Sequence, residues 1–307
     1  MRSARRLAAA LALCATAAAG CGLGPGENEG DVTLTVTRDY GSKVMLQRTD
    51  SIKESDTVLR VLDRNTEITT RYGGGFIQSI DGLAGTQSGG RTSDWFFYVN
   101  GIESPIGSAQ YDLSAGDRVW WDYRDWTATM RVPAVVGSWP EPFLHGFQGK
   151  HYDAAVECAG PPAPCDRVGD RLAAAGVQAV ATSSPGAARP PATIEVVVGT
   201  WNAVRANPAA ASLSSGPDRS GVFARFVGTK RPLLELENAR GEPAGSVGRG
   251  GGLVAALRHG DDPPLWVVIG TDGKGVAAAA KLIGDALQNR YAVATQPGAG
   301  AIGVPVP

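Results

Sequence analysis

The residues that could perform acid–base or metal chemistry are few and scattered along the chain. Its three histidines are His145, His151 and His259, and none has a second His or Cys at the spacing of metal ligands. His259 lies in the segment Arg-His-Gly-Asp-Asp-Pro-Pro, where Asp261 and Asp262 are typical of a solvated turn. Neither a G-x-S-x-G elbow nor an H-E-x-x-H motif occurs. The sequence predicts no catalytic or metal-binding residue, although an enzyme whose triad is assembled across the fold stays an open alternative.

One glycine-rich turn could receive an anion. Residues 270–275, Gly-Thr-Asp-Gly-Lys-Gly, lie between a predicted strand and a predicted helix, where free backbone N–H groups can bind phosphate. The turn is not a Walker loop, because Gly275 stands where that motif has Ser or Thr after Lys274. Capping of the helix by Asp272 is the simpler interpretation.

Cysteine usage indicates a protein that leaves the cytoplasm. Cys158 and Cys165 flank the turn-forming segment Ala-Gly-Pro-Pro-Ala-Pro, and no second pair completes a zinc site. Outside the cytoplasm such a pair is expected to be oxidised. A disulfide that closes so small a loop stabilises the fold by about 2.5 kcal/mol in the chain-entropy model. We therefore expect a disulfide between these two residues.

The first 20 residues predict a secretory signal peptide. Arg2, Arg5 and Arg6 form a positive region, and the apolar stretch that follows is too short for a transmembrane helix. Without these arginines the formal net charge falls from −1 to −4. The chain has no basic stripe, which argues against a nucleic-acid partner. Its length of 307 residues favours two domains.

The residues around the expected cleavage point suggest lipid attachment. The segment Ala-Ala-Gly-Cys that ends at Cys21 resembles the lipobox of bacterial lipoproteins, with Ala18 where Leu is commoner. The resemblance implies a lipid anchor on Cys21, with residues 21–30 as a flexible spacer. The protein would then sit on the outer face of the cytoplasmic membrane. Simple secretion is the alternative.

Residues 31–126 predict a small α+β domain. Alternation over residues 32–37 favours a half-buried strand, and residues 57–62 favour a helix. Residues 95–99, Trp-Phe-Phe-Tyr-Val, form an aromatic strand closed by Asn-Gly, which is a hairpin signal. A last strand is expected over residues 118–123. Together these elements predict a sheet covered by one helix.

Several ordered motifs of this domain resemble a known family. They are the run from Gly75 to Leu83, the run from Trp95 to Gly101, the segment Gly-Ser-Ala-Gln-Tyr at 107–111, and Gly116-Asp117. They are similar to the transcobalamin C-terminal-like domain, a β-grasp-like module of exported bacterial proteins. The resemblance covers about residues 31–124 and implies a β-grasp-like fold.

The resemblance also implies a ligand surface. In the vitamin carriers this domain forms one wall of a cobalamin site, and the corresponding residues here are Trp95, Phe96, Tyr98, Pro105 and Ile106. A corrinoid would be a bound ligand, not a reacting cofactor. The chain departs from the carriers because Phe96 replaces a more polar residue and because no helical-barrel domain is present.

The aromatic strands leave one face without an assigned partner. Side chains alternate along a strand, so Trp95 and Phe97 share one face while Phe96 and Tyr98 share the other. One face must form the domain core, and Trp120 of the last strand belongs with the remaining face. That face, with Phe96, Tyr98 and Trp120, either binds a ligand or packs against the next domain.

The rest of the chain predicts a linker and a second domain. Residues 127–150 are rich in Pro and Gly and read as a linker. Residues 151–297 alternate strand-like and helix-like segments, which predicts an α/β layered domain. Its clearest helix is expected over residues 275–288. Residues 298–307 are expected to be a disordered tail.

The leading interpretation is a lipid-anchored, non-enzymatic binding protein for a small ligand. The resemblance suggests cobalamin or a related corrinoid as that ligand and a vitamin-uptake transporter as a protein partner. Two alternatives stay open: a structural or interaction protein of the cell envelope, and an extracellular enzyme of the second domain.

Overall fold

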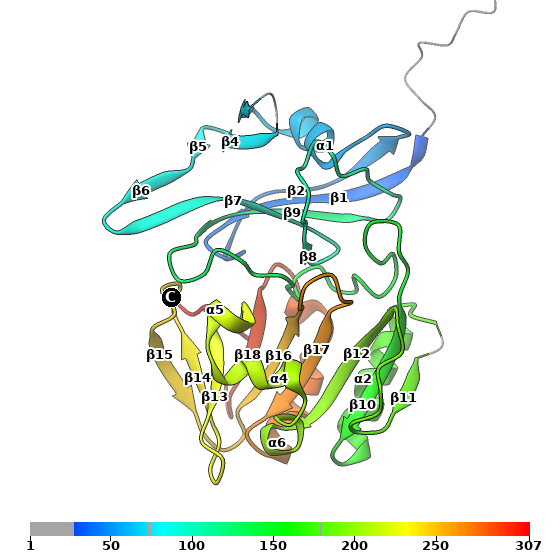
Figure 1. Ribbon diagram of the computed structural model, residues 1–307, viewed down its shortest axis with the longest axis vertical. Helices are drawn as coiled ribbons and strands as arrows, with labels where there is room; N and C mark the ends of the chain where they lie inside the picture. The colour runs from blue at the N-terminus through cyan, green and yellow to red at the C-terminus, as the bar shows by residue number, and fades with distance from the viewer. Residues whose placement is uncertain (1–27, 73–74, 179) are drawn as a thin grey trace, which may run out of the picture.

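The protein folds as two β-rich domains stacked one above the other (Figure 1). The computed structural model describes residues 28–72, 75–178 and 180–307. The predicted signal peptide and Cys21 lie outside these residues. We call residues 28–126 the N-terminal domain, residues 127–150 the connecting segment, and residues 151–307 the C-terminal domain. Within the described part of the chain, no helix is long and apolar enough to cross a bilayer.

The N-terminal domain is built on one sheet of order β2-β1-β9-β7-β6, with β8 added beside β7. Strands β1 and β9 run parallel and the other pairs antiparallel. The strands are β1 (Asn28–Arg38), β2 (Lys43–Lys53), β6 (Thr86–Ser88), β7 (Arg91–Val99), β8 (Ile102–Glu103) and β9 (Arg118–Asp125). The alternating, aromatic and final strands predicted from the sequence are β1, β7 and β9.

One face of this sheet is covered by helix α1 (Val58–Asn65), as the sequence predicted. Val32, Leu34 and Val36 alternate along β1 and are at most 1% exposed. They share a core with Val61 and Leu62 of the helix.

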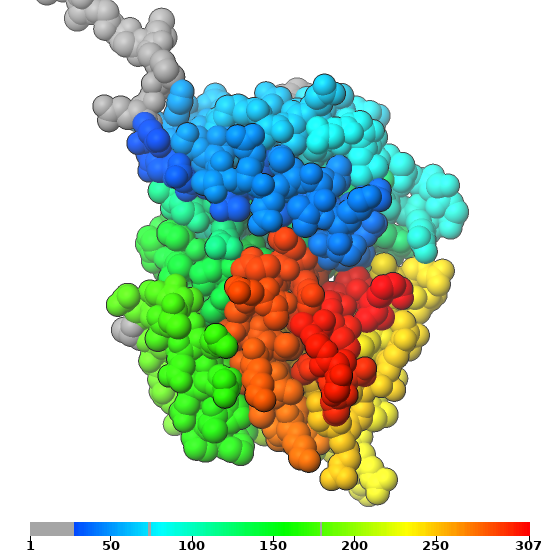
Figure 2. Space-filling view, turned by 180° about the vertical axis from the view of Figure 1, so that it is seen from behind, coloured from blue at the N-terminus to red at the C-terminus, as the bar shows by residue number. Residues whose placement is uncertain are grey.

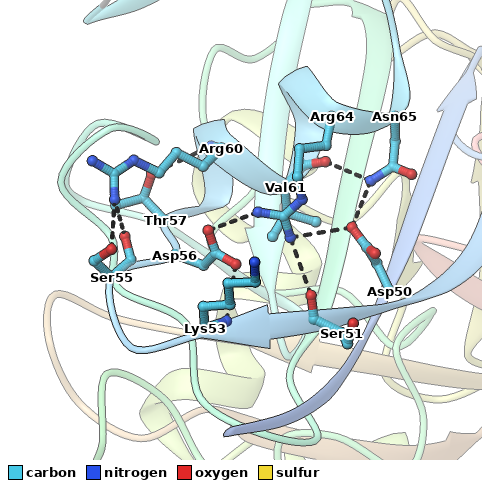
Figure 3. Close-up of polar contacts among 10 residues, drawn as sticks. All are labelled: Asp50, Ser51, Lys53, Ser55, Asp56, Thr57, Arg60, Val61, Arg64 and Asn65. Carbon is cyan, nitrogen blue, oxygen red and sulfur yellow. Dashed lines mark hydrogen bonds and ion pairs between the residues drawn. The ribbon is translucent and has the colours of Figure 1, made fainter. Parts of the chain in front are cut away.

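Polar contacts hold α1 to strand β2 (Figure 3). Thr57 caps the helix by accepting a hydrogen bond from the backbone N–H of Arg60. The guanidinium of Arg64 reaches Asp56 at 2.7 Å and Asp50 at 3.2 Å. These ion pairs tie the last turn of the helix to the strand below it.

A second, smaller sheet lies beside the aromatic strand. It has the order β3-β4-β5, formed by β3 (Ile68–Arg71), β4 (Phe76–Ile80) and β5 (Leu83–Ala84). Trp95 donates from its indole N–H to the carbonyl of Leu83 at 2.8 Å. The hydroxyl of Tyr123 donates to the carbonyl of Ala84 at 3.0 Å. The two sheets of the domain are joined by these bonds.

The C-terminal domain contains a sheet of order β11-β10-β12-β17-β16-β18-β19. The first four strands in this order pair in parallel, and the remaining pairs are antiparallel. The strands are β10 (Asp153–Ala159), β11 (Ala181–Ser183), β12 (Thr193–Thr200), β16 (Gly252–Leu257), β17 (Leu265–Gly270), β18 (Ala292–Thr295) and β19 (Ile302–Val304).

Both faces of this sheet are covered, which explains the continuous apolar sequence of β17. Trp266 and Val268 share a core with α2 (Pro162–Ala174) and α6 (Gly273–Lys281). Val267 and Ile269 face the opposite core. That core is closed by the elements α3 (Trp201–Val204), α4 (Pro208–Ala211), η2 (Ser212–Ser214), α5 (Pro217–Ser220), β13 (Ala224–Val227), β14 (Leu233–Glu237) and β15 (Pro243–Val247).

Two parts of the C-terminal domain differ from the sequence prediction. The helix expected over residues 275–288 ends at Lys281, because Gly284 has a φ of 136° and the chain continues as η3 (Asp285–Leu287). Residues 298–307, expected to be a disordered tail, instead include β19, which pairs with β18. The tail is ordered because its strand completes the sheet, and Val304 is buried.

The connecting segment packs between the two domains. Trp139, Phe143 and Phe147 are each at most 6% exposed. The backbone N–H of Val136 donates to the carbonyl of Tyr291 at 3.2 Å, which joins the segment to the strand β18 region. The segment is therefore part of the interface that positions the two domains.

Candidate functional site

The six residues predicted to form a ligand surface lie in three different environments. Trp95 is 6% exposed, on the face that shares the core with α1. Its ring packs edge-on against Tyr123, with 5.3 Å between centroids. Pro105 and Ile106 lie exposed in the loop after β8. These three residues do not share a surface with the other three.

Phe96, Tyr98 and Trp120 face the C-terminal domain. Tyr98 is 0% exposed and Trp120 is 2% exposed. The ring of Tyr291, from the C-terminal domain, lies 5.7 Å from that of Tyr98 and 5.4 Å from that of Trp120. Phe96 is half-buried under the guanidinium of Arg124, 3.7 Å from its ring centroid. This is the placement that domain packing predicts for the second face of the aromatic strand.

A buried carboxylate lies at the centre of this interface. Asp122 accepts hydrogen bonds from the hydroxyl of Thr37 at 2.6 Å and from the backbone N–H of Gly41 at 3.1 Å. It accepts a third from the hydroxyl of Tyr291, at 2.9 Å, and the hydroxyl of Tyr98 donates to that of Tyr291 at 3.3 Å. Burial raises the pKa of Asp122 to about 6, although these hydrogen bonds act in the opposite direction. The network fixes the register of the two domains.

Arg124 is the cation of the same interface and is 0% exposed. Its guanidinium donates to the carbonyls of Thr129 at 3.0 Å and Met130 at 2.7 Å, at the start of the connecting segment. Sequence reasoning missed Asp122 and Arg124. The available signal was that both charged residues share the unassigned face of the last strand with Trp120.

The histidines singled out in the sequence do not gather. His145 contacts Glu141 through Nδ1 at 2.6 Å, whereas His151 and His259 are exposed. The described residues contain no group of three or more His, Cys, Asp or Glu that could hold a metal ion. Asp272 caps α6 by accepting from the backbone N–H of Gly275 at 2.9 Å, as predicted.

An open cavity lies on the C-terminal domain, close to the interface. The loop between β16 and β17, orange in Figure 1, rises toward the N-terminal domain and forms one wall. Helices α4 and α5 form the other. The cavity has a volume of 360 Å³, which lies within the range of about 300–1,000 Å³ for small-molecule sites. We call it the arginine cleft, and its lining residues are Arg189, Pro208, Ala209, Ser212, Arg219, Ser220, Leu257, Arg258, His259, Asp262, Pro263 and Leu265.

Arg258 is the buried cation of the arginine cleft. Its side chain is only 7% exposed. The Nε–H donates to the backbone carbonyl of Asp262 at 2.9 Å, and the guanidinium lies 5.5 Å from the ring centroid of Phe147. The contact with Asp261 is 3.8 Å long and that carboxylate is 94% exposed. Burial raises the pKa of Glu103, and the positive charge of Arg258 is one of the effects that lower it. The side chain of Arg258 is thus largely covered, and its one ion pair among the described residues is long and reaches an exposed carboxylate.

Two further arginines add positive charge to the cleft. Arg189 donates to the carbonyl of Pro263, and its partial burial lowers the pKa of the guanidinium against the opposing effect of Glu195 and Asp262. Arg219 is exposed at the rim. With Asp262 as the one carboxylate among the lining residues, the cleft carries excess positive charge. Its apolar floor, formed by Leu257 and Leu265, fits a small organic anion.

Two serines and His259 also line the arginine cleft, but they form no activated nucleophile. The hydroxyl of Ser220 donates to the carbonyl of Gly216 at 2.8 Å, and that of Ser212 donates to the carbonyl of Ala209 at 2.7 Å. Among the described residues neither hydroxyl is hydrogen-bonded to His259.

The predicted disulfide is present between Cys158 and Cys165. It joins the end of β10 to the first turns of α2, with 5.7 Å between the Cα atoms. The bond lies outside the arginine cleft.

Comparisons with known proteins match part of the chain. A family model described as a domain of unknown function (DUF4430) matches residues 55–125. No curated protein matches. A crystal structure of a candidate metal-binding protein from Ruminococcus gnavus ATCC 29149 is 18% identical, covers 32% of this chain and 98% of its own, and has a TM-score of 0.25. Haptocorrin in complex with Cbi is 13% identical, with 32% of this chain and 26% of that chain covered and a TM-score of 0.26.

Proposed function

We propose that the protein is an exported, lipid-anchored and non-enzymatic binding protein for a small organic anion, which it holds in the arginine cleft. The observation that carries this proposal is Arg258, a cation with a 7% exposed side chain that lines an open 360 Å³ cavity. A buried charge without a close counter-ion is unfavourable, and an anionic ligand would compensate it. Arg189 and Arg219 supply further donors for a carboxylate or phosphate.

The size and lining of the cleft define the ligand class. The apolar floor offers burial to a short hydrocarbon or aromatic body, and the arginines select a negative charge. The aromatic face that the family resemblance implies for a corrinoid is filled by Tyr291 and its neighbours. A small anion therefore replaces a corrinoid as the proposed ligand.

The test is calorimetric titration of the mature chain, residues 22–307, with inorganic phosphate, benzoate and cobinamide. We expect benzoate to bind most tightly because it uses both the charge and the apolar floor. Arg258→Gln should weaken binding by at least about tenfold, since a hydrogen bond to a charged group contributes about 1.5–3 kcal/mol. Arg231→Gln, which changes an exposed arginine outside the cleft, is the matched control and should bind as the wild type does.

Three results would contradict this proposal. The first is the absence of binding for both anions at millimolar concentration. The second is equal weakening by Arg258→Gln and Arg231→Gln. The third is hydrolysis of p-nitrophenyl acetate that Ser220→Ala abolishes, which would favour an enzyme. Lipid attachment is tested separately by the mass of the membrane-extracted protein, which Cys21→Ser should reduce by the mass of the lipid.

A structural role in the cell envelope is the second candidate function. It is favoured by the interface itself, where Tyr98 and Trp120 serve domain packing. A purified protein that binds none of the three probes but is cross-linked to one envelope protein in cells would support this role.

A further inference from the structure

Four exposed apolar residues gather at the outer end of the N-terminal domain. We call them the outer apolar patch: Tyr72, Phe76, Pro105 and Ile106. Tyr72 is 88% exposed, Phe76 42% and Ile106 38%. Large side chains at this exposure do not contribute to the core of the domain, and their clustering needs a separate explanation.

The patch is continuous because two loops meet at Gly75. A Cβ atom on Gly107 would lie 3.5 Å from the carbonyl oxygen of Gly75, and one on Gly75 would lie 3.7 Å from that of Tyr72. The loop that carries Pro105 and Ile106 therefore lies against the segment that carries Tyr72 and Phe76. Residues about 30 positions apart in the chain thus form one surface.

The N-terminal domain begins at the same end of the molecule. In Figure 1, β4 and the start of β1 both lie at the upper edge, opposite the C-terminal domain. Figure 2, seen from behind, again shows the first described residues, in dark blue, at this upper end. The patch and the start of β1, which the spacer precedes in the sequence, therefore share one end of the N-terminal domain.

The spacer limits how far this end can move from a membrane. Asn28 lies seven positions after Cys21, and a fully extended chain spans at most about 3.6 Å per residue. A lipid on Cys21 would hold Asn28 within about 25 Å of the bilayer surface. An anchored protein therefore keeps the start of β1, and with it this end of the N-terminal domain, close to the bilayer.

We propose that the outer apolar patch rests on the lipid bilayer and orients the protein. Tyr72 fits this role because a tyrosine ring combines an apolar body with a polar tip, as at membrane–water interfaces. Phe76 and Ile106 enter the headgroup boundary beside it. The C-terminal domain then points away from the membrane. This inference rests on the lipid anchor of the proposed function, and it is independent of the anion ligand.

The experiment supplies the tether chemically. Cys158 and Cys165 are joined in a disulfide, so a chain beginning at Cys21 has one free thiol, which can be coupled to a maleimide lipid in phosphatidylcholine vesicles. Hydrogen exchange of the backbone amides of Tyr72, Phe76 and Ile106 is compared with and without vesicles. We expect at least about threefold slower exchange on the vesicles.

Two variants separate membrane contact from mere proximity. The triple variant Tyr72→Ser, Phe76→Ser and Ile106→Ser should abolish the slower exchange. The double variant Val44→Ser and Met45→Ser is the matched control. These residues are also exposed, but they lie at the start of β2, next to the turn that packs on the C-terminal domain. The control should exchange as the wild type does.

The proposal is overturned by equal exchange on and off the vesicles, or by slowing that the triple variant retains. It is also overturned if the slowing occurs in native envelope membranes and not in protein-free vesicles, which would identify a protein partner. Because the tether is chemical, failure here is distinct from failure of natural lipidation or of anion binding.

Discussion

Asp122 provides a test of the interface that joins the two domains. Its carboxylate is 0% exposed and accepts hydrogen bonds from Thr37, Gly41 and Tyr291. Asp122→Asn preserves the shape of the side chain and removes its charge. The amide oxygen can accept from Thr37 and Gly41, and the amide N–H can donate to the hydroxyl of Tyr291. The variant therefore isolates the effect of the buried charge.

The magnitude follows from the pKa of the carboxyl group. Its pKa rises from 3.8 to about 6 on folding, and each pKa unit corresponds to about 1.4 kcal/mol, which gives roughly 3 kcal/mol. Because the pKa is higher in the folded protein, the stabilising contribution of the protonated group is fully present below about pH 4. It is lost as the pH rises through 6. The Asp122→Asn variant has no ionisable group at this position and therefore carries no such loss.

The assay is urea unfolding followed by tryptophan fluorescence at pH 4.5, 5.5, 6.5 and 7.5. We expect Asp122→Asn to raise the free energy of unfolding by about 1–3 kcal/mol at pH 7.5. The difference from the wild type should shrink as the pH falls below 6. Asp63→Asn, which changes an exposed carboxylate on α1, is the control and should leave the pH profile unchanged.

Two results would refute this reasoning. One is a difference between Asp122→Asn and the wild type that does not vary with pH. The other is a variant less stable than the wild type at pH 7.5, which would mean that the ionised carboxylate holds the domains together more strongly than its burial opposes folding.

Three further predictions concern stability, each measured by urea unfolding. Gly41→Ala should lower the free energy of unfolding by at least about 3 kcal/mol, because Gly41 has a φ of 78° and a Cβ there would lie 2.0 Å from the carbonyl oxygen of Asn289. A loss under about 1 kcal/mol would contradict this prediction. Replacing Cys158 and Cys165 by serine should lower it by about 2.5 kcal/mol, and reduction of the double variant should have no further effect. Glu237→Gln should raise it by roughly 2 kcal/mol above pH 8 and less at pH 5, because burial raises the pKa of this carboxyl to about 7 while loss of the ion pair with Arg225 offsets part of the gain. Equal effects at both pH values would contradict this prediction.

Features that depend on residues close together in the sequence could be predicted from it. Alternation over residues 32–37 predicted β1, and the two cysteines seven positions apart predicted the disulfide. These features depend on neighbours in the sequence. The edge strand β2 gave no such signal, because Ile52 is its one fully buried side chain and most of its other side chains are exposed.

Long-range features could not be predicted in the same way. Periodicity divided the aromatic strand into two faces, but it could not show that Tyr291, 193 residues after Tyr98, covers the second face. A strand pattern records which side chains share a face and not what lies opposite them.

The arginine cleft had no local signal either. Arg189, Arg219 and Arg258 are separated by long stretches with no common motif, and each alone is typical of a solvated surface. Burial of the Arg258 side chain depends on the fold of the loop between β16 and β17 and on Phe147 of the connecting segment. Whether Arg258, which follows the last residue of β16, lines a cleft or faces solvent therefore depends on the tertiary structure and not on its neighbours in the sequence.

Anion binding in the arginine cleft is the central claim, and crystals of the mature chain soaked with p-bromobenzoate test it most directly. The anomalous signal of bromine locates the ligand without assumptions about its site. We predict bromine over the apolar floor near Leu257 and Leu265, with the carboxylate within hydrogen-bond distance of Arg258. An empty cleft at saturating p-bromobenzoate, or a bromine signal confined to another surface, would contradict the proposed function.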